Sequence, residues 1–377
     1  MHLTSDKRKK VAIISRESDQ KTLDIAMLEA ELKRQGADVR VLSRLLTKEK
    51  SLKALGYAGH VLKQEAAILS SDVVVLDTYC IPASMIPHRK GTKVVQMWHA
   101  LAAIKKFGWQ TVGKEGGSSE KTAKLMRMHH GYDYVVCASD VTAEHFCEAF
   151  RTDRSRIVKY GLPRIDYIKN VACGDRRDDM ARKIISAYPQ LKKTSQNASL
   201  KNEKPVILYA PTFRKGKAVD VQSLIDALDL DKYNLVVKLH PLYRGTAEQT
   251  DRSSSTDFKA AGSAAVIYDD SFSSFDWLSV ADVIISDYSS LVIESTLADK
   301  PLFIYTYDLD EYEENTGLNI DFNSEPIAPY VFRDAASLAK ALDTDYDMQA
   351  LRAFRDRYID IETDNCTSAL ADFILSV

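Results

Sequence analysis

The chain has 377 residues, of which 45% are hydrophobic and 28% are charged, and its formal net charge at pH 7 is -2. This length exceeds what one ordinary core needs, so two domains are expected, and the near-neutral charge gives no reason to expect nucleic-acid binding. The cysteines (Cys80, Cys137, Cys147, Cys173 and Cys366) include no CxxC pair, which argues against a zinc site or a disulfide framework and favours a reducing, cytoplasmic setting.

The N-terminal half alternates short β-branched runs with helical stretches. A helix is expected over residues 22–35, closed by Gly36, and a second helical stretch covers 52–69. The strands of this half are expected at 11–15, 39–42, 72–77, 93–97 and 134–138. Strands that are apolar throughout and separated by helices are typical of a parallel sheet covered on both faces. We therefore expect a first doubly wound domain over residues 1–180.

Residues 52–69 combine Leu, Ala, Val and Ile with Lys53, His60 and Lys63. This pattern fits an amphipathic helix on a membrane surface, and it also fits a helix that packs on its own domain, which is the commoner outcome. No apolar run in the sequence reaches the length of a membrane span. We therefore expect a cytoplasmic protein, and peripheral contact with a membrane stays open.

The composition becomes highly polar between residues 170 and 204, which we interpret as a linker or an exposed helix pair at the domain boundary. Beyond this segment, strands are expected at 206–210, 235–239, 265–268, 283–286 and 302–305, followed by a helical tail over 335–376. This pattern predicts a second doubly wound domain over residues 200–377. Two such domains in tandem would face each other across a cleft with the carboxyl edges of their strands, where ligands bind.

Two histidines follow expected strands directly. His99 comes after Trp98 at the end of the strand 93–97, and His240 stands in the run Lys238-Leu239-His240-Pro241. Histidine titrates near neutral pH, so His99 could act as a general base at the sheet edge, and His240 could neutralise a phosphate oxygen. The plainer alternative for each is a hydrogen-bonded residue in a loop or at a strand end.

Phosphate-binding side chains are expected at the strand ends of the second domain. Residues 286–290 (SDYSS) lie between a strand and a helical run, so Ser289 and Ser290 could bind an anion together with helix N–H groups, or simply cap the helix. Arg214, which follows another strand, offers a planar fork suited to phosphate. The remaining candidates are Lys238 for phosphate, and Thr212, Asp287 and Glu294 for other parts of a phosphorylated donor.

The sequence offers no metal or cofactor motif. His129 and His130 are adjacent, so they cannot both face one ion from a regular element. The absence of GxGxxG and Walker sequences argues against a dinucleotide-dependent oxidoreductase and a P-loop NTPase. We therefore expect neither a cofactor nor a metal.

A series of ordered motifs between residues 93 and 312 resembles the CDP-glycerol glycerophosphotransferases of teichoic acid synthesis. The motifs are 95–99 (VQMWH) with 105–108 (KKFG), 209–214 (YAPTFR), 238–241 (KLHP), 286–290 (SDYSS), and 299–302 (DKPL) with 307–312 (YDLDEY). The resemblance implies an α/β, GT-B-like fold of two Rossmann-like doubly wound domains that face each other across a cleft, with the active site between them.

The resemblance also implies transfer of glycerol phosphate or ribitol phosphate from CDP-glycerol or CDP-ribitol to a hydroxyl, with release of CMP. The implied acceptor is an undecaprenyl-diphosphate-linked glycan or a growing polyol-phosphate chain at the cytoplasmic membrane face. His99 matches the base that takes the acceptor proton, and His240 matches a histidine that contacts the donor diphosphate. Arg214, Ser289 and Ser290 match positions near the donor phosphates. The chain length favours a primase-like single transfer.

Two other functions stay open at this point. A GT-B glycosyltransferase would use the same site to move a sugar from a nucleotide sugar. A membrane-surface scaffold for a wall-polymer assembly line would keep the fold without chemistry. The presence of His99, His240, Arg214 and Ser289 argues against the scaffold.

Overall fold

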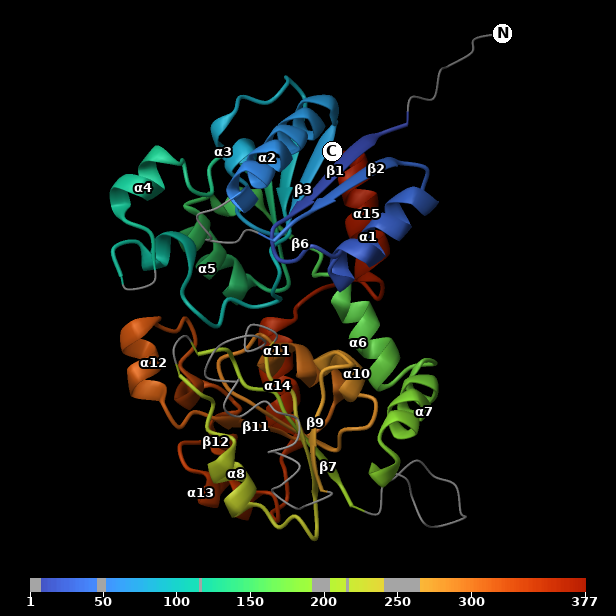
Figure 1. Ribbon diagram of the computed structural model, residues 1–377, viewed down its shortest axis with the longest axis vertical. Helices are drawn as coiled ribbons and strands as arrows, with labels where there is room; N and C mark the ends of the chain where they lie inside the picture. The colour runs from blue at the N-terminus through green and yellow to red at the C-terminus, as the bar shows by residue number, and fades with distance from the viewer. Residues whose placement is uncertain (1–7, 46–51, 115–116, 192–203, 215–216, 241–264) are drawn as a thin grey trace. The chain divides into compact units, whose positions relative to one another are not determined.

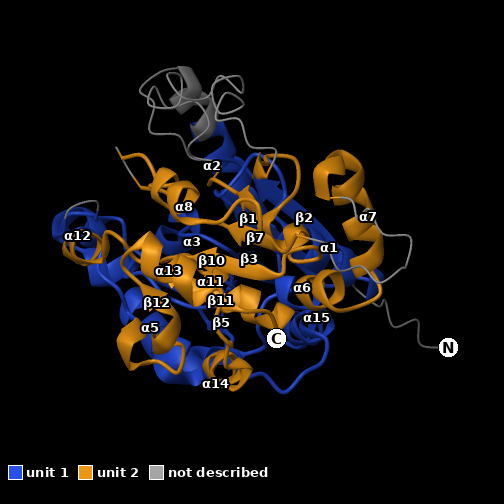
Figure 2. Cartoon of the chain, turned by 90° about the horizontal axis from the view of Figure 1, so that it is seen from below, with its two compact units in different colours: residues 1–166, 315–319, 357–377 blue, residues 167–314, 320–356 orange. Residues whose placement is uncertain are grey.

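The computed structural model describes residues 8–45, 52–114, 117–191, 204–214, 217–240 and 265–377. The chain divides into two compact units (Figure 2). Unit 1 comprises Met1–Asp166, Asn315–Asn319 and Arg357–Val377, and unit 2 comprises Tyr167–Glu314 and Ile320–Asp356. Each unit is described by itself below.

Unit 1 is built on a six-stranded sheet in the order β2-β1-β3-β4-β5-β6, and every neighbouring pair is parallel. Its strands are β1 (Lys10–Ser15), β2 (Asp38–Ser43), β3 (Val73–Leu76), β4 (Lys93–Gln96), β5 (Tyr134–Cys137) and β6 (Ile157–Lys159). The central strands form the core because both of their faces are apolar; β3, for example, reads Val-Val-Val-Leu and is buried throughout. The strand order reverses between β1 and β3, which is the position where doubly wound sheets bind ligands.

The helices of unit 1 cover this sheet (Figure 1). They are α1 (Leu23–Arg34), α2 (Leu52–Ser70), α3 (Ile81–Met85), α4 (Glu120–Leu125), α5 (Asp140–Phe150) and α15 (Cys366–Ser376), with a 3-10 turn at Gly108–Thr111. Helix α6 (Arg164–Ala172) crosses the boundary between the units. Helix α1 ends as expected at Gly36, whose φ of 92° suits glycine.

Unit 2 is built on a second six-stranded parallel sheet in the order β12-β11-β10-β7-β8-β9. Its strands are β7 (Val206–Tyr209), β8 (Asn234–Val237), β9 (Val266–Tyr268), β10 (Val283–Ser286), β11 (Leu302–Tyr305) and β12 (Val331–Phe332). In the order of the chain this is the 3-2-1-4-5-6 arrangement of dinucleotide-binding folds. The switch point therefore lies between β7 and β10.

The α-helices that the structure describes in unit 2 have from 4 to 11 residues. They are α7 (Arg177–Ala187), α8 (Gln222–Ala227), α10 (Ser274–Trp277), α11 (Leu291–Glu294), α12 (Leu309–Asn315), α13 (Ala335–Ala341) and α14 (Met348–Tyr358). The helical run expected after the serines is α11 followed by a 3-10 turn, Ser295–Ala298, and this whole run is buried. The expected helical tail is present as α13, α14 and α15.

These observations confirm the expected α/β class and the two doubly wound sheets, with differences at the edges. The short strands β6 and β12 were not expected, because two or three residues at a sheet edge carry little periodic signal. The units also differ from the expected ranges 1–180 and 200–377, since the first boundary lies at Asp166 and the end of the chain returns to unit 1. The polar segment 192–203 lies outside the described residues.

The return of the C-terminus has a physical cause. Helix α15 lies beside α1 (Figure 1) and buries Leu370 and Ile374. Its N-terminus is held in unit 1, because the backbone N–H groups of Cys366 and Thr367 donate to the Asp166 carboxylate at 2.9 and 2.7 Å. A carboxylate at a helix N-terminus is favourable for the helix dipole as well. The last helix is therefore part of unit 1.

Candidate active site

His99 lies at the carboxyl edge of the unit 1 sheet, beyond the end of β4. The turn into it is unusual, since Trp98 has a φ of 59°, a conformation that a bulky side chain rarely adopts. Gln96 stabilises this turn: its side-chain oxygen accepts from the Trp98 N–H at 2.9 Å, and its amide nitrogen donates to the Thr78 carbonyl at 3.2 Å. Backbone strain of this kind is concentrated at functional sites.

The imidazole of His99 is held in one tautomer. Its Nδ1 lies 2.9 Å from the backbone carbonyl of Asp77, and because a carbonyl only accepts, Nδ1 must carry the proton. In the neutral ring, Nε2 then keeps its lone pair and can accept a proton. The Glu17 carboxylate lies 3.7 Å from Nδ1, so it can stabilise an imidazolium formed at His99. This arrangement is chemically compatible with a general base, and the role of His99 stays a prediction.

The Asp77 side chain lies at the same edge, beneath the surface. It is 1% exposed, and burial raises its pKa to about 7, although the hydroxyls of Ser15 and Thr78 act in the opposite direction. Near neutral pH the carboxyl group is therefore about half protonated. The backbone carbonyl of the same residue is the one that orients His99. Neither Glu17 nor Asp77 was singled out from the sequence. The available signal was the position of Glu17 two residues after β1 and of Asp77 directly after β3.

Aromatic rings support the turn of His99 from below. The Trp98 ring stacks on Phe107 at 4.5 Å between centroids and lies 4.1 Å from the His99 ring. Phe107 belongs to the 105–108 motif, in which Gly108 has a φ of 56° and would place a Cβ 2.4 Å from the Ala149 carbonyl oxygen. The glycine of this motif is thus required by close packing and by backbone conformation.

The adjacent histidines of the sequence have separate environments. Burial lowers the pKa of His129 to about 3, so it is neutral, and its Nδ1 lies 2.9 Å from the Tyr132 hydroxyl. His130 is exposed and contacts Arg127. Among the described residues, no group of His, Cys, Asp and Glu side chains is arranged to hold a metal ion.

In unit 2, the candidates gather at the switch point between β7 and β10. Arg214 follows β7 and is nearly buried, with 5% of its side chain exposed. Its Nη1 donates to Asp287 at 2.7 Å, and its Nε and Nη2 donate to Asp308 at 2.6 and 3.0 Å. The guanidinium group thus joins the ends of β7, β10 and β11. Its predicted contact with a donor phosphate stays a prediction.

Asp287 lies beneath the loops that follow β7 and β10. Its fully buried carboxylate accepts from the backbone N–H groups of Thr212, at 2.9 Å, and Tyr288, at 2.6 Å, as well as from Arg214. Thr212 is also buried, and its hydroxyl has no hydrogen-bond partner among the described residues. These contacts give Asp287 and Thr212 a positioning role, and their predicted contact with nucleotide or polyol is untested. Asp308 was missed, although it lies in the 307–312 motif.

The two serines lie at the surface of this arrangement. Ser289 and Ser290 are partly exposed, and their backbone N–H groups have no acceptor among the residues that the structure describes. The Ser289 hydroxyl accepts from the Leu291 N–H at 3.3 Å, and the Ser290 hydroxyl donates to Glu294 at 3.2 Å. Glu294 is 2% exposed and so lies below the serines. The backbone N–H groups of both serines and the O–H group of Ser289 can therefore be offered to an anion.

Lys238 and His240 follow β8 on the neighbouring side of β7. The Lys238 ammonium donates to the carbonyl and the carboxylate of Asp269 at 3.1 and 3.2 Å, so it is already paired. Although burial acts to raise the pKa of Asp269, hydrogen bonds from Trp277 and Tyr188 lower it below its ordinary value. His240 is exposed, 6.0 Å from the Phe213 ring. The structure therefore brings the unit 2 candidates to one sheet edge.

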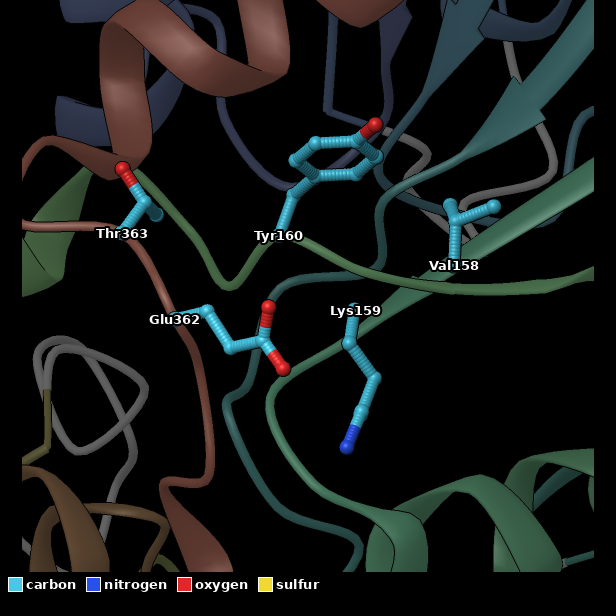
Figure 3. Close-up of a pocket in the computed structure, with 5 residues that line it drawn as sticks. All are labelled: Val158, Lys159, Tyr160, Glu362 and Thr363. Atoms are coloured by element: carbon cyan, nitrogen blue, oxygen red, sulfur yellow. The ribbon is translucent and has the colours of Figure 1, made fainter.

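A hollow of about 380 Å³ lies elsewhere in unit 1, at the carboxyl end of β6. It is lined by Val158, Lys159, Tyr160, Glu362 and Thr363 (Figure 3). Lys159 is the cation of this set, and it is paired with Asp140 and Asp360 at 3.0 and 2.9 Å. None of these residues is among the candidates, and we assign no chemistry to the hollow. In the described parts of the chain, no helix combines the length and apolarity that crossing a membrane requires.

Comparisons with known proteins show which proteins this chain is similar to. The teichoic acid ribitol-phosphate primase of Bacillus spizizenii is 30% identical over 380 residues, which cover 97% of this chain and 91% of the primase. The teichoic acid glycerol-phosphate primase of Bacillus subtilis is 29% identical over 84% of this chain and 76% of its own length. A structure of the wall teichoic acid polymerase TagF, obtained with CDPG, has a similar fold, with a TM-score of 0.70 and 18% identity over 98% of this chain and 88% of that chain.

The family description "CDP-Glycerol:Poly(glycerophosphate) glycerophosphotransferase" matches residues 1–376. The match spans both units, including the sheet edges that carry His99 and the 286–290 motif. The chain therefore belongs to the CDP-glycerol:poly(glycerophosphate) glycerophosphotransferase family and is a transferase of teichoic acid biosynthesis with a GT-B-like fold.

Proposed function

We propose that this enzyme moves ribitol phosphate or glycerol phosphate from a CDP-alditol to a hydroxyl of an undecaprenyl-diphosphate-linked glycan or polyol-phosphate chain, and that CMP leaves. The observation that carries the proposal is His99, whose Nδ1 is held by the Asp77 carbonyl so that Nε2 can accept a proton. The relatives differ in their alditol, since one is a ribitol-phosphate primase and another a glycerol-phosphate primase. Both donors are therefore candidates.

In the proposed reaction, the acceptor hydroxyl loses its proton to Nε2 of His99 as its oxygen attacks the β-phosphorus of the CDP-alditol. The bond between that phosphorus and the bridging oxygen breaks, and the bridging oxygen leaves with CMP. The proton stays on His99, where the Glu17 carboxylate at 3.7 Å stabilises the imidazolium until water removes it. General-base catalysis of this type typically contributes a factor on the order of 10² to 10⁴.

On the donor side, we assign the phosphates to Ser289 and Ser290, with Lys238 and His240 at the neighbouring strand end. The support is the set of partly exposed hydroxyl and N–H groups beside a switch point, where charge developing on phosphate oxygens can be stabilised. Arg214 serves this site by holding Asp287 and Asp308, which fixes the loops after β7, β10 and β11.

We also propose that unit 1 contacts the membrane through α2. One stripe of this helix packs inward, with His60, Gln64 and Ile68 buried. Another stripe is exposed and apolar and contains Leu62 and Leu69, which are 66% and 45% exposed. Packing on the domain, the commoner of the two expectations for 52–69, is therefore present, and the helix still offers an apolar surface. An exposed apolar stripe of this kind suits contact with the membrane in which a lipid-linked acceptor is anchored.

The direct test is CMP release from CDP-ribitol and from CDP-glycerol with a lipid-linked disaccharide acceptor. We expect turnover with one donor, and a loss of about 10² to 10⁴ in kcat for His99→Ala without loss of folding. His130→Ala is the matched control, because His130 is an exposed histidine of the same unit. Full turnover in His99→Ala would remove His99 as the base. Turnover of a nucleotide sugar, but of neither CDP-alditol, would contradict the proposed reaction.

A further inference from the structure

Arg16 is a half-buried cation at the switch point of unit 1. It follows the last residue of β1, and its backbone N–H donates to the Thr78 hydroxyl beyond β3 at 3.2 Å. The carboxylate of the next residue, Glu17, lies close to the His99 ring. That ring is hydrogen-bonded to the backbone carbonyl of Asp77, which directly precedes Thr78. The ends of β1, β3 and β4 thus bring Arg16 and His99 to one sheet edge. The mechanism proposed above does not use Arg16.

The side chain of Arg16 lacks the partners that a buried guanidinium normally has. Its Nε is buried and has no hydrogen-bond acceptor, and the side chain forms no ion pair with any residue that the structure describes. Its charged carbon lies 5.3 Å from the centre of the Tyr79 ring, a cation–π contact that provides no acceptor for the buried Nε–H group. By contrast, Arg164 pairs with Asp24, and Arg214 pairs with Asp287.

An arrangement of this kind is costly unless an anion binds to it. A buried N–H without an acceptor destabilises the folded state. A phosphate supplies the missing acceptor together with an opposite charge, because its oxygens accept charge-assisted bonds from the planar fork of an arginine. Proteins retain such costs mainly at functional sites.

We propose that Arg16 forms an anion subsite beside His99, which binds a phosphate group next to the attacked hydroxyl of the acceptor. This inference rests on the proposed function, in which His99 activates that hydroxyl. It specifies the acceptor class: a chain end that already carries an alditol phosphate is preferred over a neutral glycan end. The phosphate would have its negative charge neutralised by Arg16, while its alditol places a hydroxyl at Nε2 of His99.

The first experiment measures CMP release with two lipid-linked acceptors that differ only in a terminal glycerol phosphate. For Arg16→Gln, the KM of the phosphate-bearing acceptor should rise on the order of tenfold or more, while the KM values of the neutral acceptor and of the CDP-alditol stay unchanged. Arg16→Lys keeps the charge but not the planar fork, so its KM should lie in between. Arg40→Gln, at an exposed arginine of β2, is the matched control and should behave as the wild type.

Other outcomes overturn the assignment. An equal rise in KM for both acceptors would place the anion in their shared lipid diphosphate. A rise in KM for the CDP-alditol alone would mean that Arg16 binds the donor diphosphate. Unchanged KM values for all three substrates would leave Arg16 without a role in binding.

A second experiment does not depend on turnover. Titration with sn-glycerol 3-phosphate, followed by phosphorus NMR, should show saturable binding to the wild type that weakens about tenfold or more in Arg16→Gln. Without ligand, the melting temperature of Arg16→Gln should equal or exceed that of the wild type, since an unpaired charge is removed. A lower melting temperature would make Arg16 a structural residue, and Arg16-independent binding would overturn the subsite. Arg16-dependent binding in an enzyme that releases no CMP would contradict only the proposed function.

Discussion

At the scale of single residues, hydrogen-bond direction decides which groups can react. His99 is held through Nδ1 by a carbonyl, which leaves Nε2 as the only nitrogen able to accept a proton in the neutral ring. The guanidinium group of Arg214 is paired with the carboxylates of Asp287 and Asp308, and its contact with a donor phosphate stays a prediction. In both cases the hydrogen-bond partners, and not the residue type alone, determine which atoms a ligand can reach.

Asp77 gives the stability a defined pH dependence. Its pKa is raised from 3.8 to about 7, so between these values the folded state binds more protons than the unfolded state. The favourable contribution of Asp77 to the free energy of unfolding is complete below about pH 4 and is lost as the pH rises through 7. Asp77→Asn removes this loss, so the variant should gain stability relative to the wild type as the pH rises, by up to about 1.4 kcal/mol per pH unit.

Urea unfolding at about pH 5 and about pH 8 measures this difference. The matched control is Asp153→Asn, in an exposed cap where the hydrogen bond from Ser155 lowers the pKa of the carboxyl group. Its titration lies below the tested range, so its stability relative to the wild type should not change between the two pH values. A constant difference for Asp77→Asn would show that its carboxyl group does not titrate in this window.

At the scale of elements, the two sheets place chemistry by the same rule. Each has a reversal of strand order, between β1 and β3 in unit 1 and between β7 and β10 in unit 2, and the candidate residues lie at the carboxyl ends beside these positions. Helix α2 illustrates a second rule, since one helix can pack inward on one stripe and expose an apolar stripe elsewhere.

The exposed stripe of α2 leads to a prediction about membrane binding. Replacing Leu62 and Leu69 by Glu should weaken sedimentation with phosphatidylglycerol vesicles by about tenfold or more, because each leucine loses its apolar burial in the lipid. Leu125→Glu is the control, since this leucine is 68% exposed on α4 of the same unit. Equal binding of the double variant and the wild type would exclude α2 as the contact.

At the scale of the whole molecule, the chain returns to its first unit after building the second. Helix α15 buries Ile374 beside α1 in unit 1, whereas α13 buries Leu338 in unit 2, and both side chains are 0% exposed. Ile374→Ala should therefore destabilise unit 1, and Leu338→Ala should destabilise unit 2, each by about 2–5 kcal/mol. Hydrogen exchange resolved along the chain measures the two units separately.

In Ile374→Ala, we expect faster exchange in β1, β3 and α1, and in Leu338→Ala in β10 and β11. The two variants serve as controls for each other because each removes a buried aliphatic side chain from a helix. Faster exchange in unit 2 for Ile374→Ala would contradict the assignment of α15 to unit 1.

The sequence by itself determined the fold class, most strand positions and the candidate site residues, because apolar runs of the right length and the motifs after them are local features. It also determined that His99 follows β4 and that Ser289 and Ser290 follow β10. Only the tertiary structure decided which partners the candidate residues have, since these partners come from distant parts of the chain. Asp308 pairs with Arg214 and Asp269 with Lys238, while His99 contacts Glu17 and the Asp77 carbonyl. The placement of α15, and the lack of an acceptor for the buried Nε of Arg16 among the described residues, also depend on the tertiary structure and not on a local pattern.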